Sequence, residues 1–299
     1  MNHCFLLMTH FSAKSAYDQV LELMNEKHFF VIHFDRKTNI PPNDPFLLQL
    51  QSLPCVRLVR DRLNVQWGSY ATVEATLRLI REAFHFSNIS YFHLISGQCR
   101  HVKSIGYIHA YFSTHAGEEF IQSVDMDTIP DFLSRFAIFH WHDYYNLRST
   151  RLKDVTLRRL SKISRVVQKT MALVGLRRRT PEWFPNRYVG SAWWSLTAEC
   201  CRYMLAFIKE NPAFVQRFKY TQLADEMFFQ TLIMQSRFRE RVAGRNLRFI
   251  SFKTRHAEEL TMAHALEVSG RDILFARKIT RGSEALMAFV RERAVEVVG

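Results

Sequence analysis

Short apolar runs alternate with amphipathic stretches of helical length along the first hundred residues of this chain. Strands that alternate with helices in this way indicate a mostly parallel sheet with helices on both faces. We therefore expect an α/β fold. Strands are expected at residues 4–9, 29–34, 56–59 and 91–95, and helices at residues 15–27 and 70–86.

Ligands of such sheets bind beyond the carboxyl ends of the strands. Asp35 follows the second expected strand, and the loop at residues 60–68 follows the third. Ser96, Gly97 and Gln98 follow the fourth strand. We therefore expect a ligand site where these residues meet.

The chain is strongly basic, with 41 Lys and Arg residues against 28 Asp and Glu residues and a formal net charge of +13. Its partners are therefore expected to be anionic. Nucleic acid, nucleotide-sugar phosphates, lipid-linked diphosphates and anionic membranes all meet this condition. A basic nucleic-acid-binding protein ranks last among these, because the sequence has no recognisable nucleic-acid-binding motif.

The cysteines and the N-terminal segment bear on the compartment. Five cysteines are an odd number and lack metal-site spacing, which is typical of reduced thiols in a cytoplasm. Residues 1–10 contain a short apolar run without a basic leader, and no later segment has the length of a membrane span. We expect a soluble cytoplasmic protein, with peripheral attachment to the inner face of the cytoplasmic membrane as the alternative.

Residues 148–179 are dominated by Arg and Lys, with Asp154 as the single acid. Apolar residues recur between the bases at helical spacing, at Leu157, Leu160, Ile163, Val167, Met171 and Val174. Two interpretations remain open. The segment is either a surface helix that packs its apolar face on the core, or a basic amphipathic helix that lies on an anionic membrane.

Asp225 and Glu226 stand at the threshold of an apolar, helix-like stretch. Asp225 is placed to cap that helix, and Glu226 would lie in its first turn, where the helix dipole favours a negative charge. A carboxylate held ionised in this way can accept a proton from a sugar hydroxyl. Alone, however, the pair has the pattern of an ordinary helix start.

The acidic pair is one of several short segments that occur in a characteristic order. Together they resemble the core-2/I-branching β-1,6-N-acetylglucosaminyltransferase and peptide O-xylosyltransferase family, glycosyltransferase family 14, as a bacterial-type member. The resemblance covers about residues 1–280 and is weakest in the basic insert. The segments are VIHFDRKT (31–38), VQWGS (65–69), YFHLISGQ (91–98), GSAWWSLT (190–197), ADEMFF (224–229), LRFI (247–250) and LFARK (274–278).

The resemblance implies a single GT-A (Rossmann-like) glycosyltransferase domain over residues 1–299. Its nucleotide-binding half would span about residues 1–115, a basic helical insert about 148–180, and an acceptor-binding and catalytic half about 181–299. It further implies a UDP-sugar donor, a glycan or lipid-linked glycan acceptor, and inverting transfer without a metal or other cofactor. N-acetylglucosamine is the expected sugar, with UDP-xylose as the rival donor, and bacterial surface polysaccharide or lipooligosaccharide synthesis is the expected setting.

The resemblance also implies roles for particular residues. Glu226 would be the base that deprotonates the acceptor hydroxyl. Arg248 and Lys278 would neutralise the departing diphosphate in place of a metal, and Arg255 competes with Arg248 because the intervening loop differs in length. Residues expected at the nucleotide-sugar are His33, Asp35, Arg60, Arg62, Trp67, Gly68, Gly190 and Ser191. Residues expected at the acceptor are Ser96, Gly97, Gln98, Trp193 and Asp225.

Some of these residues have a second interpretation. His33 has the pattern of a buried, hydrogen-bonded histidine as well as that of a ligand. Gly190 would let the backbone approach the sugar closely, since glycine has no side chain to obstruct it. Trp193 and Trp194 would offer a stacking surface for carbohydrate, with one of the two in the core.

Asp125 and Asp127 have the Asp-X-Asp spacing that can hold a divalent cation on a diphosphate. A metal-dependent GT-A transferase is therefore the alternative enzyme. The pair lies well downstream of the expected strand at residues 91–95, at whose end a GT-A sheet would place its metal motif. A loop or an acidic patch on the acceptor side is the other interpretation of these two residues.

Overall fold

The computed structural model describes residues 1–146, 149–176, 178, 186–253 and 257–296. A five-stranded sheet with strand order β3-β2-β1-β4-β8 lies at its centre. Strands β1, β2, β3 and β4 run parallel to one another, and β8 pairs with β4 in the antiparallel direction. This arrangement confirms the expected α/β fold with a mostly parallel sheet. The strands are β1 (Asn2–Thr9), β2 (His28–Phe34), β3 (Val56–Leu58), β4 (Ile89–Ser96) and β8 (Ser195–Thr197).

Both faces of the central sheet are covered, because successive side chains of a strand point to opposite sides. In β1, Cys4 and Leu6 belong to one buried cluster together with α3 (Ala71–Ala83). Phe5 and Leu7 belong to a second buried cluster together with α1 (Ala13–Leu23). Continuous apolar runs in the sequence thus correspond to strands that are buried on both faces.

The helices of the first half follow from local signals. The Ser12 side chain accepts a hydrogen bond from the N–H of Ser15 at 3.3 Å and so caps α1. Asp44 caps α2 (Pro45–Ser52), which has a proline at its first position, where no N–H is needed. The expected helix at residues 15–27 ends earlier, at Leu23, and the one expected at residues 70–86 is α3.

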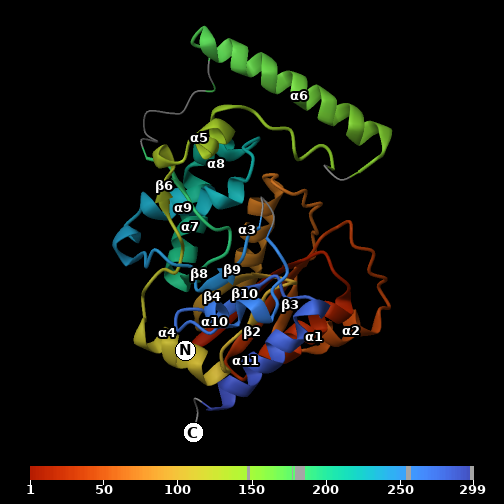
Figure 1. Cartoon of the computed structure of the whole chain (residues 1–299), viewed down its shortest axis with the longest axis vertical. Helices are drawn as coiled ribbons and strands as arrows, with labels where there is room; N and C mark the ends of the chain where they lie inside the picture. The colour runs from red at the N-terminus through yellow and green to blue at the C-terminus, as the bar shows by residue number, and fades with distance from the viewer. Residues whose placement is uncertain (147–148, 177, 179–185, 254–256, 297–299) are drawn as a thin grey trace.

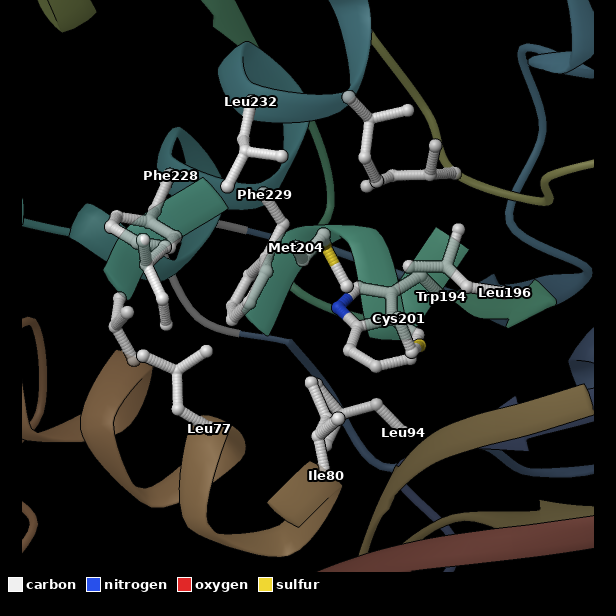
Figure 2. Close-up of a cluster of buried hydrophobic side chains, with 14 of the residues drawn as sticks. Leu77, Ile80, Leu94, Trp194, Leu196, Cys201, Met204, Phe228, Phe229 and Leu232 are labelled. Carbon is white, nitrogen blue, oxygen red and sulfur yellow. The ribbon is translucent and has the colours of Figure 1, made fainter. Parts of the chain in front are cut away.

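The second half supplies β8 and a helical layer over one face of the sheet. Figure 2 shows Phe229 of this layer and Trp194, just before β8, above Leu77 and Ile80 of α3, all within one buried cluster. This packing joins the two halves of the chain around a shared core. The elements of the layer are α7 (Ala198–Glu210), α8 (Pro212–Phe218), the 3₁₀ turn η2 (Ala224–Glu226), α9 (Phe228–Met234) and the 3₁₀ turn η3 (Arg239–Arg241).

Two smaller sheets extend the core. One has the strand order β5-β10-β9, and the other pairs β6 with β7. Their strands are β5 (Arg100–His101), β9 (Arg248–Ile250), β10 (Phe275–Arg277), β6 (Val124–Asp125) and β7 (Tyr188–Val189). The remaining elements are α4 (Ile105–Thr114), η1 (Met126–Thr128), α5 (Pro130–Ala137), η4 (Met262–His264), α10 (Ala265–Val268), η5 (Arg281–Ser283) and α11 (Glu284–Glu296).

The basic segment forms one long helix, α6 (Leu152–Leu173), at one end of the molecule (Figure 1). Most of the apolar stripe named in the sequence does not pack on the core, since Leu160, Ile163 and Val167 are exposed and Leu157 is only half-buried. Ser161 is its one buried residue. The interpretation of this segment as a surface helix with its apolar face on the core is therefore wrong.

Candidate active site

The acidic pair lies in a short 3₁₀ turn, not at the start of an α-helix. Asp225 and Glu226 belong to η2, and α9 begins only at Phe228, with no side chain capping either element. Leu223, before the turn, has a left-handed conformation with φ 57°. The prediction that Asp225 caps a helix and that Glu226 occupies its first turn is therefore wrong. A left-handed residue other than glycine costs free energy and is often found at functional sites.

Burial dominates the electrostatics of this pair. Burial raises the pKa of Glu226 well above that of a free carboxyl group, and the nearby charge of Asp225 raises it further. Burial also raises the pKa of Asp225. One oxygen of Asp225, Oδ1, is buried without a hydrogen-bond partner in the part of the chain that the structure describes. The expectation that a helix dipole keeps Glu226 ionised is therefore wrong. Burial instead makes the carboxyl group of Glu226 hold its proton more strongly than a free carboxyl group.

The loop after β7 holds the acidic turn in place. The N–H of Gly190 donates to the carbonyl oxygen of Glu226 at 2.9 Å, and Gln230 donates to that of Ser191 at 2.7 Å. A Cβ atom on Gly190 would lie 1.9 Å from the carbonyl oxygen of Gln122. Contact with the protein's own backbone therefore already requires glycine at this position.

Arg277, at the end of β10, reaches the same place. Its Nε donates to Ser96 Oγ at 3.1 Å, and its guanidinium carbon lies 5.0 Å from the ring centre of Trp193. The positive charge of Arg277 acts against the burial that raises the pKa of Asp225. Arg277 is assigned no role of its own from the sequence, although its position in the LFARK motif is a signal that could have singled it out.

The segment after β4 lies against both the sheet and β10. A Cβ atom on Gly97 would lie 2.6 Å from Thr9 Oγ1, so the backbone there packs tightly on the end of β1. The carbonyl oxygen of Gln98 accepts a hydrogen bond from the N–H of Ile279 at 2.9 Å. Lys278, between Arg277 and Ile279, is half-buried beside this segment. The structure thus brings Ser96, Gly97 and Gln98 together with Arg277 and Lys278.

Three residues predicted at the nucleotide lie at the carboxyl end of β2. His33 is buried, and its Nε2 accepts from the N–H of Leu63 at 2.9 Å, so it fixes the loop after β3. Asp35 is also buried, and its Oδ1 accepts from the N–H of Lys37 at 2.8 Å. The guanidinium of Arg62 donates to the carbonyl oxygens of Phe34 and Asp35 at 3.1 and 2.6 Å.

The loop from Arg60 to Gly68 connects this region to the acidic turn. Arg60 and Trp67 are exposed, with 53% of Trp67 accessible. Gly68 has φ +74°, and its carbonyl oxygen accepts from the N–H of Leu223 at 3.0 Å. Gly68 therefore lies directly beside the turn that carries Glu226.

Arg248 is turned into the protein interior. Its guanidinium donates to the carbonyl oxygens of Leu94 and Trp194 at 3.2 and 2.6 Å, and to Ser195 Oγ at 3.1 Å. Burial lowers its pKa to about 9. These contacts differ from the predicted diphosphate role, since they direct the donors of Arg248 to the junction of β4 and β8. Its competitor, Arg255, lies outside the described residues.

The Asp-X-Asp pair is engaged elsewhere. Asp125 accepts from the N–H of Asp127 at 2.9 Å and caps η1. The carboxylate of Asp127 forms an ion pair with Arg187 at 2.6 Å. Within the described ranges, no cluster of three or more His, Cys, Asp or Glu side chains has a metal-binding arrangement. The two carboxylates thus have structural partners.

The two tryptophans of the GSAWWSLT motif differ in burial. Trp194 is fully buried in the core, whereas Trp193 is half-buried and contacts Arg277.

Among the described helices, none is long and apolar enough to cross a membrane.

Comparison with known families identifies the chain. The profile of the family described as Branch: Core-2/I-Branching enzyme matches residues 4–273. Among curated proteins, none matches the sequence. The match covers most of the chain, and the mostly parallel five-stranded sheet is consistent with a GT-A-like glycosyltransferase fold. This protein therefore belongs to the Core-2/I-Branching enzyme family of glycosyltransferases.

Proposed function

We propose that this glycosyltransferase moves a sugar from a UDP-sugar to a hydroxyl of a glycan acceptor, with inversion at the anomeric carbon and without a metal. The convergence of Asp225 and Glu226 with Arg277 beyond the carboxyl ends of the parallel strands carries the proposal. A metal-free displacement requires an acid–base group beside the acceptor hydroxyl and a cation beside the departing diphosphate, on opposite sides of the anomeric carbon.

Glu226 acts as the general base in this proposal. Its ionised carboxylate takes the proton of the acceptor hydroxyl as the hydroxyl oxygen bonds to the anomeric carbon. The bond between that carbon and the UDP oxygen breaks on the opposite side, and UDP leaves with the electron pair. A carboxylate whose pKa is raised by burial is a stronger base than an exposed one, which suits the abstraction of a proton from an alcohol.

Lys278 and Arg277 stabilise the charge that develops on the leaving diphosphate. Arg277 is the last residue of β10 and Lys278 follows it, and both lie against the segment after β4. Arg248 supports this arrangement from within by fixing β4 against β8. We therefore assign the diphosphate contact to Arg277 and Lys278 and a positioning role to Arg248. Arg255 is a further candidate for the diphosphate contact.

The nucleotide of the donor occupies the carboxyl ends of β1 and β2. Asp35 and Lys37 would contact it, while His33 and Arg62 hold the surrounding loops. Arg60 and Trp67 lie exposed at the rim of this region, and Gly68 and the loop at Gly190 and Ser191 adjoin the transferred sugar. UDP-N-acetylglucosamine is the proposed donor, and UDP-xylose is the alternative.

The acceptor is a glycan or a lipid-linked glycan of bacterial surface polysaccharide or lipooligosaccharide synthesis. Trp193, Asp225 and the segment Ser96–Gln98 are the proposed acceptor contacts, because they adjoin Glu226 and Arg277. A lipid-linked acceptor would require the enzyme to work at the cytoplasmic face of a membrane, which is its proposed location.

A product analysis tests the proposal. The protein is incubated with UDP-N-acetylglucosamine or UDP-xylose and a saccharide acceptor panel, with and without excess EDTA. The anomeric proton coupling of the product is then read by NMR. We expect a β-linked product from the α-linked donor, formed at the same rate in EDTA. An α-linked product, or activity that EDTA abolishes and manganese restores, would contradict the proposed mechanism.

A further inference from the structure

Helix α6 presents its polar side to the rest of the protein. Ser161 accepts a hydrogen bond from the hydroxyl of Tyr145 at 3.1 Å, and Ser164 accepts one from the indole N–H of Trp141 at 3.2 Å. One turn further on, Gln168 accepts from the N–H of Phe139 at 2.6 Å. These contacts place Ser161, Ser164 and Gln168, at spacings of three and four residues, on the inward face.

The opposite side of α6 is apolar and open to solvent. Ile163 is 59% exposed, Val166 is 64% exposed and Val167 is 50% exposed. Leu152 and Leu160 are exposed along the same helix. A helix on the surface of a globular protein normally turns its apolar stripe to the core and its polar residues to water. The orientation of α6 is the reverse, and within the part of the chain that the structure describes nothing covers its apolar face, which is typical of an interaction surface.

Basic side chains border the apolar face. The helix and the residue before it carry seven Lys and Arg residues and the single acid Asp154. At 100° per residue, Arg159, Lys162 and Lys169 lie on the flank beside Val166, and all three are exposed. Asp154, the one opposing charge, accepts a hydrogen bond from the N–H of Asn146 on the inward side. The charged side chains at the border of the outward apolar face are therefore all positive.

Two exposed aromatic residues lie beside the helix, in the segment that contacts its inward face. Trp141 and Tyr144 are exposed in the segment on which α6 rests, and their rings lie 6.2 Å apart. Trp and Tyr are enriched at the interface between lipid and water, because each ring combines an apolar body with a polar group. The α6 surface, defined as the outward face of α6, combines aliphatic and cationic side chains, and the exposed Trp141 and Tyr144 lie beside the helix.

We propose that the α6 surface binds the surface of an anionic phospholipid bilayer, with its aliphatic side chains inserted among the lipids and its basic side chains at the headgroups. Charge complementarity selects this occupant. A second copy of the chain would bring two cationic helices together, and their repulsion would oppose pairing.

Hydrogen bonds and ring contacts connect the α6 region to the segment that precedes the candidate active site. Arg178, just beyond the helix, donates to Thr221 Oγ1 at 2.9 Å and to the carbonyl oxygen of Arg217 at 2.6 Å. The ring of Tyr220 lies 5.1 Å from that of Trp141, and the chain continues from Tyr220 directly to the turn of Glu226. A protein bound through α6 would hold this turn at a fixed position relative to the bilayer. The link to a membrane-held acceptor rests on the proposed function, whereas lipid binding itself does not.

Vesicle co-sedimentation of the full chain tests the proposal. Vesicles of phosphatidylcholine alone are compared with vesicles that also contain phosphatidylglycerol, at low and high salt. We expect binding to the anionic vesicles that weakens as salt rises. The double variant Ile163→Ser with Val166→Ser, and separately Lys162→Glu with Lys169→Glu, should each weaken this binding at least ~10-fold. Leu48→Ser, on the exposed side of α2, is the matched control and should bind like the parent protein.

Three results would overturn the proposal. They are equal binding to neutral and anionic vesicles, full binding by both double variants, and a dimer that the Ile163→Ser and Val166→Ser variant converts to monomer. The last result would show that a second copy covers the helix. UDP affinity and transfer to a soluble acceptor, measured without vesicles, should be unchanged in every variant. Loss of lipid binding and failure of the proposed transfer chemistry are therefore distinguished.

Discussion

The guanidinium group of Arg248 donates a hydrogen bond to the carbonyl oxygen of Trp194 at 2.6 Å. This contact joins β9 to the residue just before β8. The same guanidinium also donates to Leu94 in β4. The second and first halves of the chain are thus tied together by one buried cation at the edge of the central sheet.

Removing that cation should mainly destabilise the fold. Arg248→Ala leaves the carbonyl oxygens of Leu94 and Trp194 buried without these donors, at a cost on the order of 3 kcal/mol in the free energy of unfolding. Urea titration measures this loss, with Arg202→Ala, on the partly exposed surface of α7, as the comparison. Unchanged stability together with lost UDP affinity would instead return Arg248 to direct contact with the diphosphate.

The loop at Gly190 should not tolerate a side chain. Because a Cβ atom there would lie 1.9 Å from the carbonyl oxygen of Gln122, Gly190→Ala must displace the loop that donates to the carbonyl of Glu226. We expect kcat to fall by about 10²-fold, since small displacements of catalytic groups are costly. Gly106→Ala, at a helical position with open space around it, is the matched substitution and should retain activity. Equal activity of the two variants would exclude the positioning role of the loop.

Arg277 and Lys278, at the end of β10, should act on the chemical step more than on donor binding. Lys278→Ala and Arg277→Ala are each expected to lower kcat by about 10²-fold, because cations that stabilise a leaving group matter most in the transition state. Lys209→Ala, on the exposed end of α7, serves as the control for loss of charge. Steady-state kinetics with a soluble acceptor separates the two parameters. A rise in KM at constant kcat would assign the pair to donor binding only.

Buried histidines should make the fold sensitive to mild acid. Burial, with smaller effects from neighbouring histidines, lowers the pKa of His3 to about 3, and burial lowers that of His28 to about 4. At these histidines the unfolded chain therefore binds more protons than the folded one below pH ~6.5, so their contribution to stability is complete above that pH and falls as the pH drops. Each such histidine contributes a slope of up to about 1.4 kcal/mol per pH unit.

Urea titrations at several pH values measure this slope. Replacing His28 by Gln should make the slope shallower, whereas replacing the exposed His85 by Gln should leave it unchanged. A slope for His28→Gln equal to that of the parent protein would contradict the assignment of His28 as a buried neutral group.

The central sheet could be predicted from the sequence because its strands are continuous apolar runs. Element ends were less predictable, as α1 shows. Its expected end at Lys27 gives way to Leu23, since Asn25 accepts from the N–H of Lys27 at 3.0 Å and turns the chain into β2. The family motifs located the acidic pair, the glycine loop and the segment after β4, and the structure brings these together.

Side-chain direction and tertiary contacts could not be predicted from the sequence. The pattern at Asp225 matches a helix start, but Leu223 is held in a left-handed conformation while its N–H donates to Gly68, far away in sequence. Whether Arg248 points to the nucleotide or into the core depends on carbonyl groups of β4 and on Trp194, just before β8. The outward apolar face of α6 likewise follows from the polar contacts of its other side, which periodicity alone does not reveal.

The most direct measurement is the transfer rate of Glu226→Gln at saturating donor, with UDP affinity determined by calorimetry on the same preparation. We predict that kcat falls by about 10²–10⁴-fold because the base is removed, while UDP affinity is retained. The free energy of unfolding at neutral pH should rise, because the pKa of Glu226 is raised on folding and ionisation of this buried carboxyl opposes the fold. The exposed Glu292→Gln should match the parent protein in every respect. Undiminished transfer by Glu226→Gln would contradict the assignment of this residue as the base.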